Sequence, residues 1–266
     1  FFNEKFRVEH IDARYTLIDL PNLKGLRKQF LLHPFLAGFN VTSPHKVAIM
    51  SRLNEIDEEA RYVGAVNTVT IRRGFFGRRI LKGYNTDVEG FMQSIEPLLQ
   101  PWHKKALILG TGGGALAVER ACRKMAIECR MASRRIGYKD TIGYDKITPE
   151  VMAEYKIIVN TTPVGMTPHV LVAPQIPYEA ITPEHLCYDL IYAPEETRFL
   201  RLAKEQGAIV KNGLDMLLIQ ANEAWKIWEQ ALSVSVGRAP LRRSLRYSFC
   251  SPAKPLPQVT RLCPIR

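Results

Sequence analysis

The chain has 266 residues, of which 46% are hydrophobic and 24% charged, a composition typical of a globular protein. No stretch is long and apolar enough to span a bilayer and no signal-peptide pattern opens the chain, which disfavours membrane and secreted classes. Five scattered cysteines without a Cys-x-x-Cys pair argue against a disulfide framework or a zinc site and favour a reducing cytoplasm.

The net charge of +11 is unevenly distributed along the chain. Residues 233–266 hold seven Lys or Arg and no acidic residue, so the preceding part has a charge of only about +4. This segment is rich in proline and serine and shows no sustained periodicity. We therefore predict a disordered basic tail rather than an arm that binds nucleic acid.

The first hundred residues alternate short strand and helix patterns. Strand patterns occur at residues 13–20 and 36–42 and, around two glycines, as a hairpin over 67–85. Helix patterns cover residues 22–32, 44–52, 55–63 and 87–99, the last with Asp87 as the predicted cap.

After Pro101 the pattern changes to strand, glycine turn, helix and strand. Strands are predicted at residues 104–110 and 127–133, with further buried strands in 155–163 and 186–192, and helices at 111–126 and 199–208. Such alternation indicates a parallel sheet with helices on both faces. An amphipathic helix over 214–230 follows.

A glycine fingerprint lies between the first of these strands and its helix. Gly110, Gly112 and Ala115 satisfy G-x-G-x-x-[GA] in the strand-to-helix context that gives the motif its meaning. The first glycine permits a tight turn, the second lets a pyrophosphate approach the backbone, and the helix points free N–H groups at that anion. The alternative is a purely structural turn.

About twenty residues further on, an NAD site usually has a carboxylate for the ribose hydroxyls. Here the sequence is Ala132-Ser133-Arg134-Arg135, with Lys139 close behind. Two guanidinium groups suit a 2′-phosphate, so the predicted cofactor is NADP. The alternative is that these arginines lie in a solvated loop.

Seven motifs in order give this chain a resemblance to the shikimate dehydrogenase family, over almost all of residues 1–232. They are NVTSPHK (40–46), GAVNTV (64–69), GYNTDVEGF (83–91), the glycine turn, NTTPVGM (160–166), YDLIY (188–192) and KNGLDMLLIQA (211–221). The resemblance implies a two-domain α/β fold with a deep cleft between the domains. Residues 1–100, completed by the helix over 214–232, would form the substrate domain, and 101–213 a Rossmann-like NADP-binding domain with a parallel sheet.

The same resemblance implies the roles of individual residues. Lys46 would be the catalytic acid/base, paired with the catalytic Asp87 across the substrate hydroxyl. The implied substrate contacts are Thr42, Lys46, Asn67, Asp87, Tyr192 and Gln220. The implied cofactor contacts are Gly110, Thr111, Gly112, Gly113, Gly114, Ser133, Arg134, Arg135, Leu190 and Gly213, with Glu58 as a further acidic position. No metal is expected.

One departure from the family lies at the start of the chain. The family begins with a strand and a serine-rich turn whose hydroxyls hold the substrate carboxylate. This chain begins at FFNEKF, just past where that turn should end. We expect the substrate domain's sheet to lack that strand.

The implied reaction is the reversible NADPH-dependent reduction of 3-dehydroshikimate to shikimate in aromatic amino-acid (chorismate) biosynthesis. The expected enzyme is cytoplasmic, monomeric or homodimeric, and acts on a small molecule without nucleic-acid or membrane partners. Two alternatives are a dual quinate/shikimate dehydrogenase and a catalytically silent protein that binds NADP and shikimate. The joint presence of Lys46, Asp87, Asn67 and Gln220 argues against the silent protein.

Overall fold

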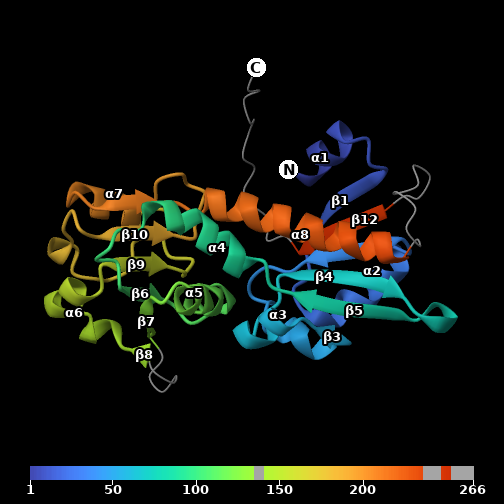
Figure 1. Ribbon diagram of the computed structural model, residues 1–266, viewed down its shortest axis with the longest axis horizontal. Helices are drawn as coiled ribbons and strands as arrows, with labels where there is room; N and C mark the ends of the chain where they lie inside the picture. The colour runs from blue at the N-terminus through green and yellow to red at the C-terminus, as the bar shows by residue number, and fades with distance from the viewer. Residues whose placement is uncertain (135–140, 236–246, 253–266) are drawn as a thin grey trace. The chain divides into compact units, whose positions relative to one another are not determined.

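The structure, a computed structural model, describes residues 1–134, 141–235 and 247–252 (Figure 1). The chain packs as two units, one of residues 1–56, 66–84 and 226 onward, the other of 57–65 and 85–225. One unit contains a mixed sheet and the other an all-parallel sheet, which confirms the predicted α/β class with a Rossmann-like part. The functional domain boundary at residue 101 stays a prediction.

The first unit is built on a six-stranded mixed sheet. Its strand order is β1 (Ala13–Ile18), β12 (Tyr247–Pro252), β2 (Leu36–Asn40), β4 (Thr68–Arg73), β5 (Arg79–Tyr84) and β3 (Glu55–Ile56). The first three strands are parallel, and β4 and β5 form the predicted antiparallel hairpin. The short helices α1 (Phe2–Val8) and α2 (Leu26–Leu32) belong to this unit.

Trp228, near the end of the long helix α8 (Leu214–Ser235), organises the core of this unit. Its indole Nε1 donates a hydrogen bond to the carbonyl of Val69 at 3.0 Å, and its ring lies 5.3 Å from that of Phe2. A Cβ atom at Gly38 would lie 2.4 Å from this Nε1, so only glycine fits there. The indole therefore approaches the backbone of both β2 and β4.

Segment 44–52 was predicted to be one helix, and that prediction is only partly right. A 3-10 helix covers Ala48–Arg52, whereas residues 44–47 form a turn. The physical reason is the carbonyl of Lys46, which accepts a hydrogen bond from the amide of Val66 at 2.8 Å. A carbonyl used in this way does not extend a helical ladder.

Strand β12 comes from the segment that was predicted to be a disordered tail. Its residues pair with β1 from Ala13↔Tyr247 to Ile18↔Pro252, and three of them pair with β2 on the other side. Disorder therefore does not describe residues 247–252, nor residues 233–235 within α8; residues 236–246 and 253–266 lie outside the described residues. The sheet expected to lack a strand thus contains one from the C-terminal region, because adjacent strands satisfy backbone groups that would otherwise stay unpaired.

The second unit is built on a six-stranded parallel sheet (Figure 1). Its order is β11 (Ile209–Lys211), β10 (Leu186–Asp189), β9 (Ile157–Asn160), β6 (Lys105–Leu109), β7 (Glu128–Ala132) and β8 (Thr141–Ile142). Ala106 and Ile108 pack with α4 (Asp87–Ile95), α5 (Gly113–Lys124) and Met216 of α8. Leu107 and Leu109 face α6 (Pro149–Glu154) and α7 (Arg198–Glu205). Helices thus cover both faces, as predicted; α3 (Glu58–Val63) also belongs to this unit.

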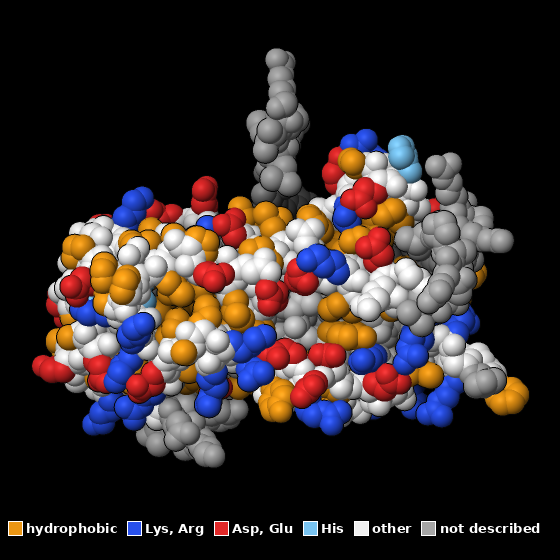
Figure 2. All heavy atoms as spheres, viewed as in Figure 1, with side chains coloured by type: hydrophobic (Ala, Val, Ile, Leu, Met, Phe, Trp, Pro, Cys, Tyr) orange, Lys and Arg blue, Asp and Glu red, His pale blue; other side chains and the backbone are white. Residues whose placement is uncertain are grey.

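Basic and acidic side chains are interspersed on the face shown in Figure 2. Ion pairs among the described residues include Arg120 with Glu59 at 2.7 Å and Arg72 with Glu55 at 3.0 Å. Among the described residues, no helix combines the length and the apolar character needed to cross a membrane.

Removal of residues 236–266 tests the role of β12. We expect the shortened chain to unfold at a lower urea concentration, because β1 loses its whole ladder to β12 and each backbone hydrogen bond contributes about 0.5–1.5 kcal/mol. The measurement is urea denaturation followed by circular dichroism. An unchanged midpoint would show that β12 contributes nothing to the stability of the fold.

The control is a chain shortened only by residues 253–266. It keeps every residue of the ladder between β1 and β12 and should unfold at the same urea concentration as the full chain.

Candidate functional site

In the first unit, the turn after β2 folds back onto the start of β4. The amide of Val41 donates to the carbonyl of Asn67 at 2.7 Å, and the amide of Val66 donates to the carbonyl of Lys46 at 2.8 Å. These two bonds bring Thr42, Lys46 and Asn67 into one region. Thr42 is exposed and Lys46 half-buried, whereas Asn67 is buried.

Asn40 braces this turn. Its amide donates to the carbonyl of Asn67 at 3.2 Å and to the hydroxyl of Thr68 at 3.1 Å, and its own oxygen accepts from Tyr15 at 2.9 Å. The hydroxyl of Thr68 in turn donates to the side-chain oxygen of Asn67 at 3.0 Å. The network holds the Asn67 side chain in place.

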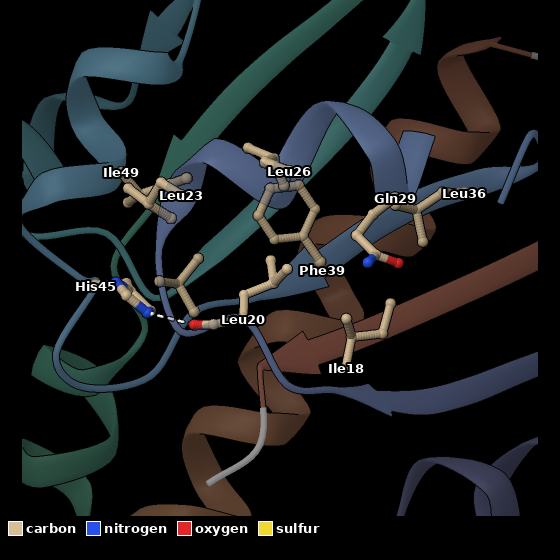
Figure 3. Close-up of a pocket in the computed structure, with 10 residues that line it drawn as sticks. Ile18, Leu20, Leu23, Leu26, Gln29, Leu36, Phe39, His45 and Ile49 are labelled. Carbon is tan, nitrogen blue, oxygen red and sulfur yellow. Dashed lines mark hydrogen bonds between the residues drawn. The ribbon is translucent and has the colours of Figure 1, made fainter. Parts of the chain in front are cut away.

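His45 is one of the residues that line a small apolar pocket (Figure 3). Its Nε2 lies 2.8 Å from the carbonyl of Leu20, which fits an N–H donor. Most of the lining is aliphatic or aromatic and includes Ile18, Leu23, Leu26 and Phe39. His45 is therefore a packed residue with a backbone partner.

In the second unit, Asp87 lies in the first turn of α4 and is buried. The prediction that Asp87 caps this helix is wrong. The side-chain oxygen of Asn85 accepts from the amides of Asp87 and Val88 at 3.0 and 3.3 Å, while its amide donates to the carbonyl of Ala65. The N-cap residue is Thr86, and the side chain of Asn85 just before it, rather than that of Asp87, accepts from the first amides of α4.

Gln220 of α8 lies near the same end of α4. The hydroxyl of Thr86 lies 3.4 Å from the Gln220 side-chain oxygen, and the Gln220 amide donates to the carbonyl of Leu217 at 3.1 Å. Close approach of the helices requires Gly90, since a Cβ atom there would lie 2.9 Å from the carbonyl oxygen of Met216. Asp87 and Gln220, separated by more than a hundred residues in sequence, thus lie on helices in close contact.

The glycine turn joins β6 to α5. Gly110 has φ +117°, a conformation that favours glycine, and a Cβ atom there would lie 2.6 Å from Oγ1 of Thr161. A Cβ atom at Gly112 would meet no atom of the described structure within 4 Å, so space is open beside it. The first amides of the twelve-residue helix α5 lie next to this space. An open space beside helix amides suits an anionic group.

Further predicted cofactor residues converge on Leu190. A Cβ atom at Gly213 would lie 2.2 Å from the Leu190 carbonyl oxygen, and one at Gly114 would lie 3.1 Å from its side chain. The amide of Gly213 donates to the carbonyl of Ile191 at 3.1 Å. Tyr192 follows directly and is partly exposed. The structure therefore groups Gly114, Leu190 and Gly213.

Ser133 and Arg134 follow β7, which is the neighbour of β6 in the sheet. The amide of Gly110 donates to the carbonyl of Ala132 at 2.9 Å, so the glycine turn and Ser133 are adjacent. Arg134 is exposed, and Arg135 lies outside the described residues.

Glu58 is exposed in the first turn of α3. The carboxylate that pairs with α5 is that of Glu59, which accepts two hydrogen bonds from Arg120 at 2.7 and 3.2 Å. These hydrogen bonds lower the pKa of Glu59. We therefore assign the contact between α3 and α5 to Glu59 rather than to Glu58.

Three buried polar residues at the carboxyl edge of this sheet were not identified from the sequence: Asn160, Asp189 and Thr197. Asn160 and Asp189 lie inside the quoted motifs NTTPVGM and YDLIY, which were the available signal. Burial raises the pKa of Asp189 to about 6, although three hydrogen bonds oppose that rise. Within the described residues, no group of three or more metal-ligand side chains occurs.

Comparison with known proteins gives concordant matches. The family model described as shikimate dehydrogenase substrate binding domain matches residues 1–69. A shikimate dehydrogenase (NADP(+)) of Carboxydothermus hydrogenoformans is 36% identical over 241 residues, covering 85% of this chain and 84% of that protein.

Solved structures agree with these matches. Shikimate dehydrogenase 1 of Peptoclostridium difficile has a TM-score of 0.74 and 31% identity, covering 86% of this chain and 85% of that one. Shikimate 5-dehydrogenase of Thermus thermophilus, in complex with NADP(H) and shikimate, has a TM-score of 0.70 and 31% identity, covering 84% of each chain.

The raised pKa of Asp189 predicts a pH dependence of stability. A carboxyl whose pKa rises from 3.8 unfolded to about 6 folded stabilises the fold below the unfolded pKa, and this contribution is lost as pH rises through 6. Between about pH 4.5 and about pH 7, the wild-type free energy of unfolding should fall by roughly 2 kcal/mol relative to Asp189→Asn. Urea denaturation of both proteins measures this difference, since all other titrations are shared. Parallel pH profiles would contradict the assignment.

Proposed function

This chain belongs to the shikimate dehydrogenase family and is an NADP-dependent oxidoreductase that reversibly reduces 3-dehydroshikimate to shikimate, and from that premise we propose which residues perform the reaction. The predicted family, reaction and cofactor are thereby confirmed. The observation that supports the residue assignment best is the folded turn that brings Lys46 beside Asn67.

Lys46 is the acid/base of the proposed mechanism. When bound, the nicotinamide supplies the hydride, as is general for this cofactor. As the hydride reaches the carbonyl carbon of 3-dehydroshikimate, the Lys46 ammonium donates a proton to the carbonyl oxygen. In the reverse direction its neutral amine accepts the hydroxyl proton. The carbonyl of Lys46 is fixed by Val66, so the side chain starts from a defined backbone position.

In this proposal, polar side chains bind the ring hydroxyls of the substrate. Asn67 is buried and held by Asn40 and Thr68, so its amide is oriented before substrate arrives. Asp87 is buried, and in this proposal its carboxylate accepts a hydrogen bond from a substrate hydroxyl. Thr42, Tyr192 and Gln220 complete the proposed substrate contacts.

The residues around the glycine turn fit a dinucleotide. The open space at Gly112 and the first amides of α5 would hold the pyrophosphate, with Gly110, Thr111, Gly113 and Gly114 forming the rest of the turn. Ser133 and Arg134 follow the adjacent strand, where the adenosine ribose of such a cofactor lies, and Arg134 would bind the 2′-phosphate. Leu190 and Gly213 would line the same site.

We propose a cytoplasmic enzyme, monomeric or homodimeric, that prefers shikimate to quinate. Cys122, Cys129 and Cys187 are free thiols, which fits a reducing compartment. Dual specificity for quinate is the rival, and oxidation of the two alcohols at equal concentrations of NADP⁺ distinguishes them. NADP⁺ and shikimate binding without any turnover would instead favour the silent binding protein.

Replacement of Lys46 tests the mechanism. Lys46→Ala should lower kcat by about 10²–10⁴, the typical contribution of a general acid, while the Kd for shikimate changes little. The assay is NADPH oxidation with 3-dehydroshikimate, together with shikimate titration. The matched control is Lys28→Ala, which removes an exposed lysine of the same unit and should leave kcat unchanged. Unchanged turnover in Lys46→Ala would refute the assignment.

Replacement of Arg134 tests cofactor selection. Arg134→Ala should raise the KM for NADPH by about 10-fold or more and leave that for NADH nearly unchanged, because only NADPH has the 2′-phosphate. Arg130→Ala, an exposed arginine on β7, is the matched control and should alter neither KM. Equal effects on both cofactors would show that Arg134 does not read the phosphate.

A further inference from the structure

We propose that Asp189 is a positioning residue for the cofactor: its buried carboxylate ties together the loops that follow β9 and β10 and the start of α7. The inference rests on the proposed cofactor site. Asp189 is not among the residues proposed above to contact substrate or cofactor, and its side chain is fully buried.

The carboxylate accepts hydrogen bonds from three separate segments. One oxygen accepts from the side-chain amide of Asn160 at 3.1 Å and from the backbone amide of Ile191 at 3.0 Å. The other oxygen accepts from the hydroxyl of Thr197 at 2.6 Å. These donors come from the end of β9, the loop after β10 and the residue that caps α7.

The bond to Asn160 connects Asp189 to the glycine turn. The side-chain oxygen of Asn160 accepts from the amide and the hydroxyl of Thr162 at 3.1 and 2.7 Å, which shapes the loop after β9. Thr161 in that loop donates its hydroxyl to the carbonyl of Leu109 at 2.7 Å and packs against Gly110. A displacement of Asn160 would therefore move the wall against which the glycine turn is packed.

The bond to Ile191 connects Asp189 to the other half of the cofactor site. Its amide is held by Asp189, and its carbonyl accepts from the amide of Gly213. Leu190 directly precedes Ile191, and its carbonyl lies against Gly213 while its side chain lies against Gly114. A displacement of the Asp189 carboxylate would therefore shift the peptide between Leu190 and Ile191, and with it the contacts of Leu190 with Gly213 and Gly114.

Thr197 completes the network. Besides donating to Asp189, its hydroxyl accepts from the amide of Leu200 at 3.4 Å and caps α7. Its Cβ lies close to Gly165, since a Cβ atom at that glycine would be 3.5 Å away. Thr197 therefore links α7 to the loop between residues 160 and 166.

A carboxylate at position 189 lowers the stability of the fold at neutral pH, so a role in stability does not explain its presence. All three donors are neutral, and burial raises the pKa of Asp189 to about 6, so the ionised form destabilises the fold at neutral pH. A carboxylate offers only acceptors, which matches three convergent donors. An amide at position 189 would present N–H groups to one of the donors. Such a costly arrangement fits a positioning role.

The experiment compares Asp189→Asn, Thr197→Val and Thr197→Ser in the full chain. Calorimetric titration with NADP⁺ gives the Kd, and steady-state assays give KM for NADPH and for 3-dehydroshikimate separately. We expect Asp189→Asn and Thr197→Val to weaken NADP⁺ binding by about 10-fold, with the KM for 3-dehydroshikimate within about twofold of wild type. Thr197→Ser keeps the hydroxyl and should bind NADP⁺ with the wild-type affinity.

Tyr178→Phe is the control for a general loss of stability. Its hydroxyl donates to the carbonyl of Pro174 at 2.9 Å within the core cluster that contains Phe199 and Leu200, and it is not one of the three hydrogen-bond donors to the Asp189 carboxylate described above. This variant should lower the unfolding midpoint and leave the NADP⁺ Kd unchanged. The inference is wrong if Asp189→Asn and Thr197→Val bind NADP⁺ with the wild-type Kd. It is also wrong if these variants raise the KM for NADPH and the KM for 3-dehydroshikimate by the same factor.

The test of Asp189 by NADP⁺ binding is independent of the test of Lys46 as the acid/base. Binding of NADP⁺ requires no chemistry, so Lys46→Ala should give the wild-type Kd in the same titration even if that residue proves not to be the acid. Absence of NADP⁺ binding by the unmodified chain would overturn the proposed cofactor site, and with it this inference.

Discussion

The hydrogen bond from the amide of Val66 to the carbonyl of Lys46 is the constraint on which the proposed substrate-binding part of the first unit depends. It holds the turn at residues 44–47 against the start of β4, and the 3-10 helix Ala48–Arg52 begins only after this turn. A lysine and a buried asparagine, twenty-one positions apart, thereby occupy one region. Asn40 and Thr68 then hold the asparagine, so the polar groups are arranged by the protein rather than by the ligand.

Close backbone approach plays the corresponding role in the second unit. A Cβ atom would collide with Thr161 at Gly110 and with Leu190 at Gly213, and it would make a tight contact with the Leu190 side chain at Gly114. Three segments can therefore meet at the carboxyl edge of the parallel sheet, the edge at which open α/β sheets bind ligands. Asp189 holds two of the loops at that edge, at the cost of a buried charge without a cationic hydrogen-bond partner.

The C-terminal region shows how tertiary context overrides composition. Its basic, proline-rich sequence favours disorder, yet residues 247–252 pair with β1 and with β2. A six-residue segment has little structure alone, because a strand gains its hydrogen bonds only from its neighbours. The charge distribution, by contrast, could be read directly: the excess of basic residues lies in the segment from 233 onward.

The sequence by itself determined the family, the α/β class, the NADP cofactor and the glycine turn, because these depend on local motifs and on the order of strands and helices. Only the tertiary structure showed that the Asn85 side chain accepts from the first amides of α4, that residues 44–47 form a turn, and that Glu59 pairs with Arg120. It alone placed β12 between β1 and β2 and joined Asp189 to Asn160 and Thr197. These features are hydrogen bonds between residues distant in sequence, and a local pattern does not specify which distant donor a given acceptor meets.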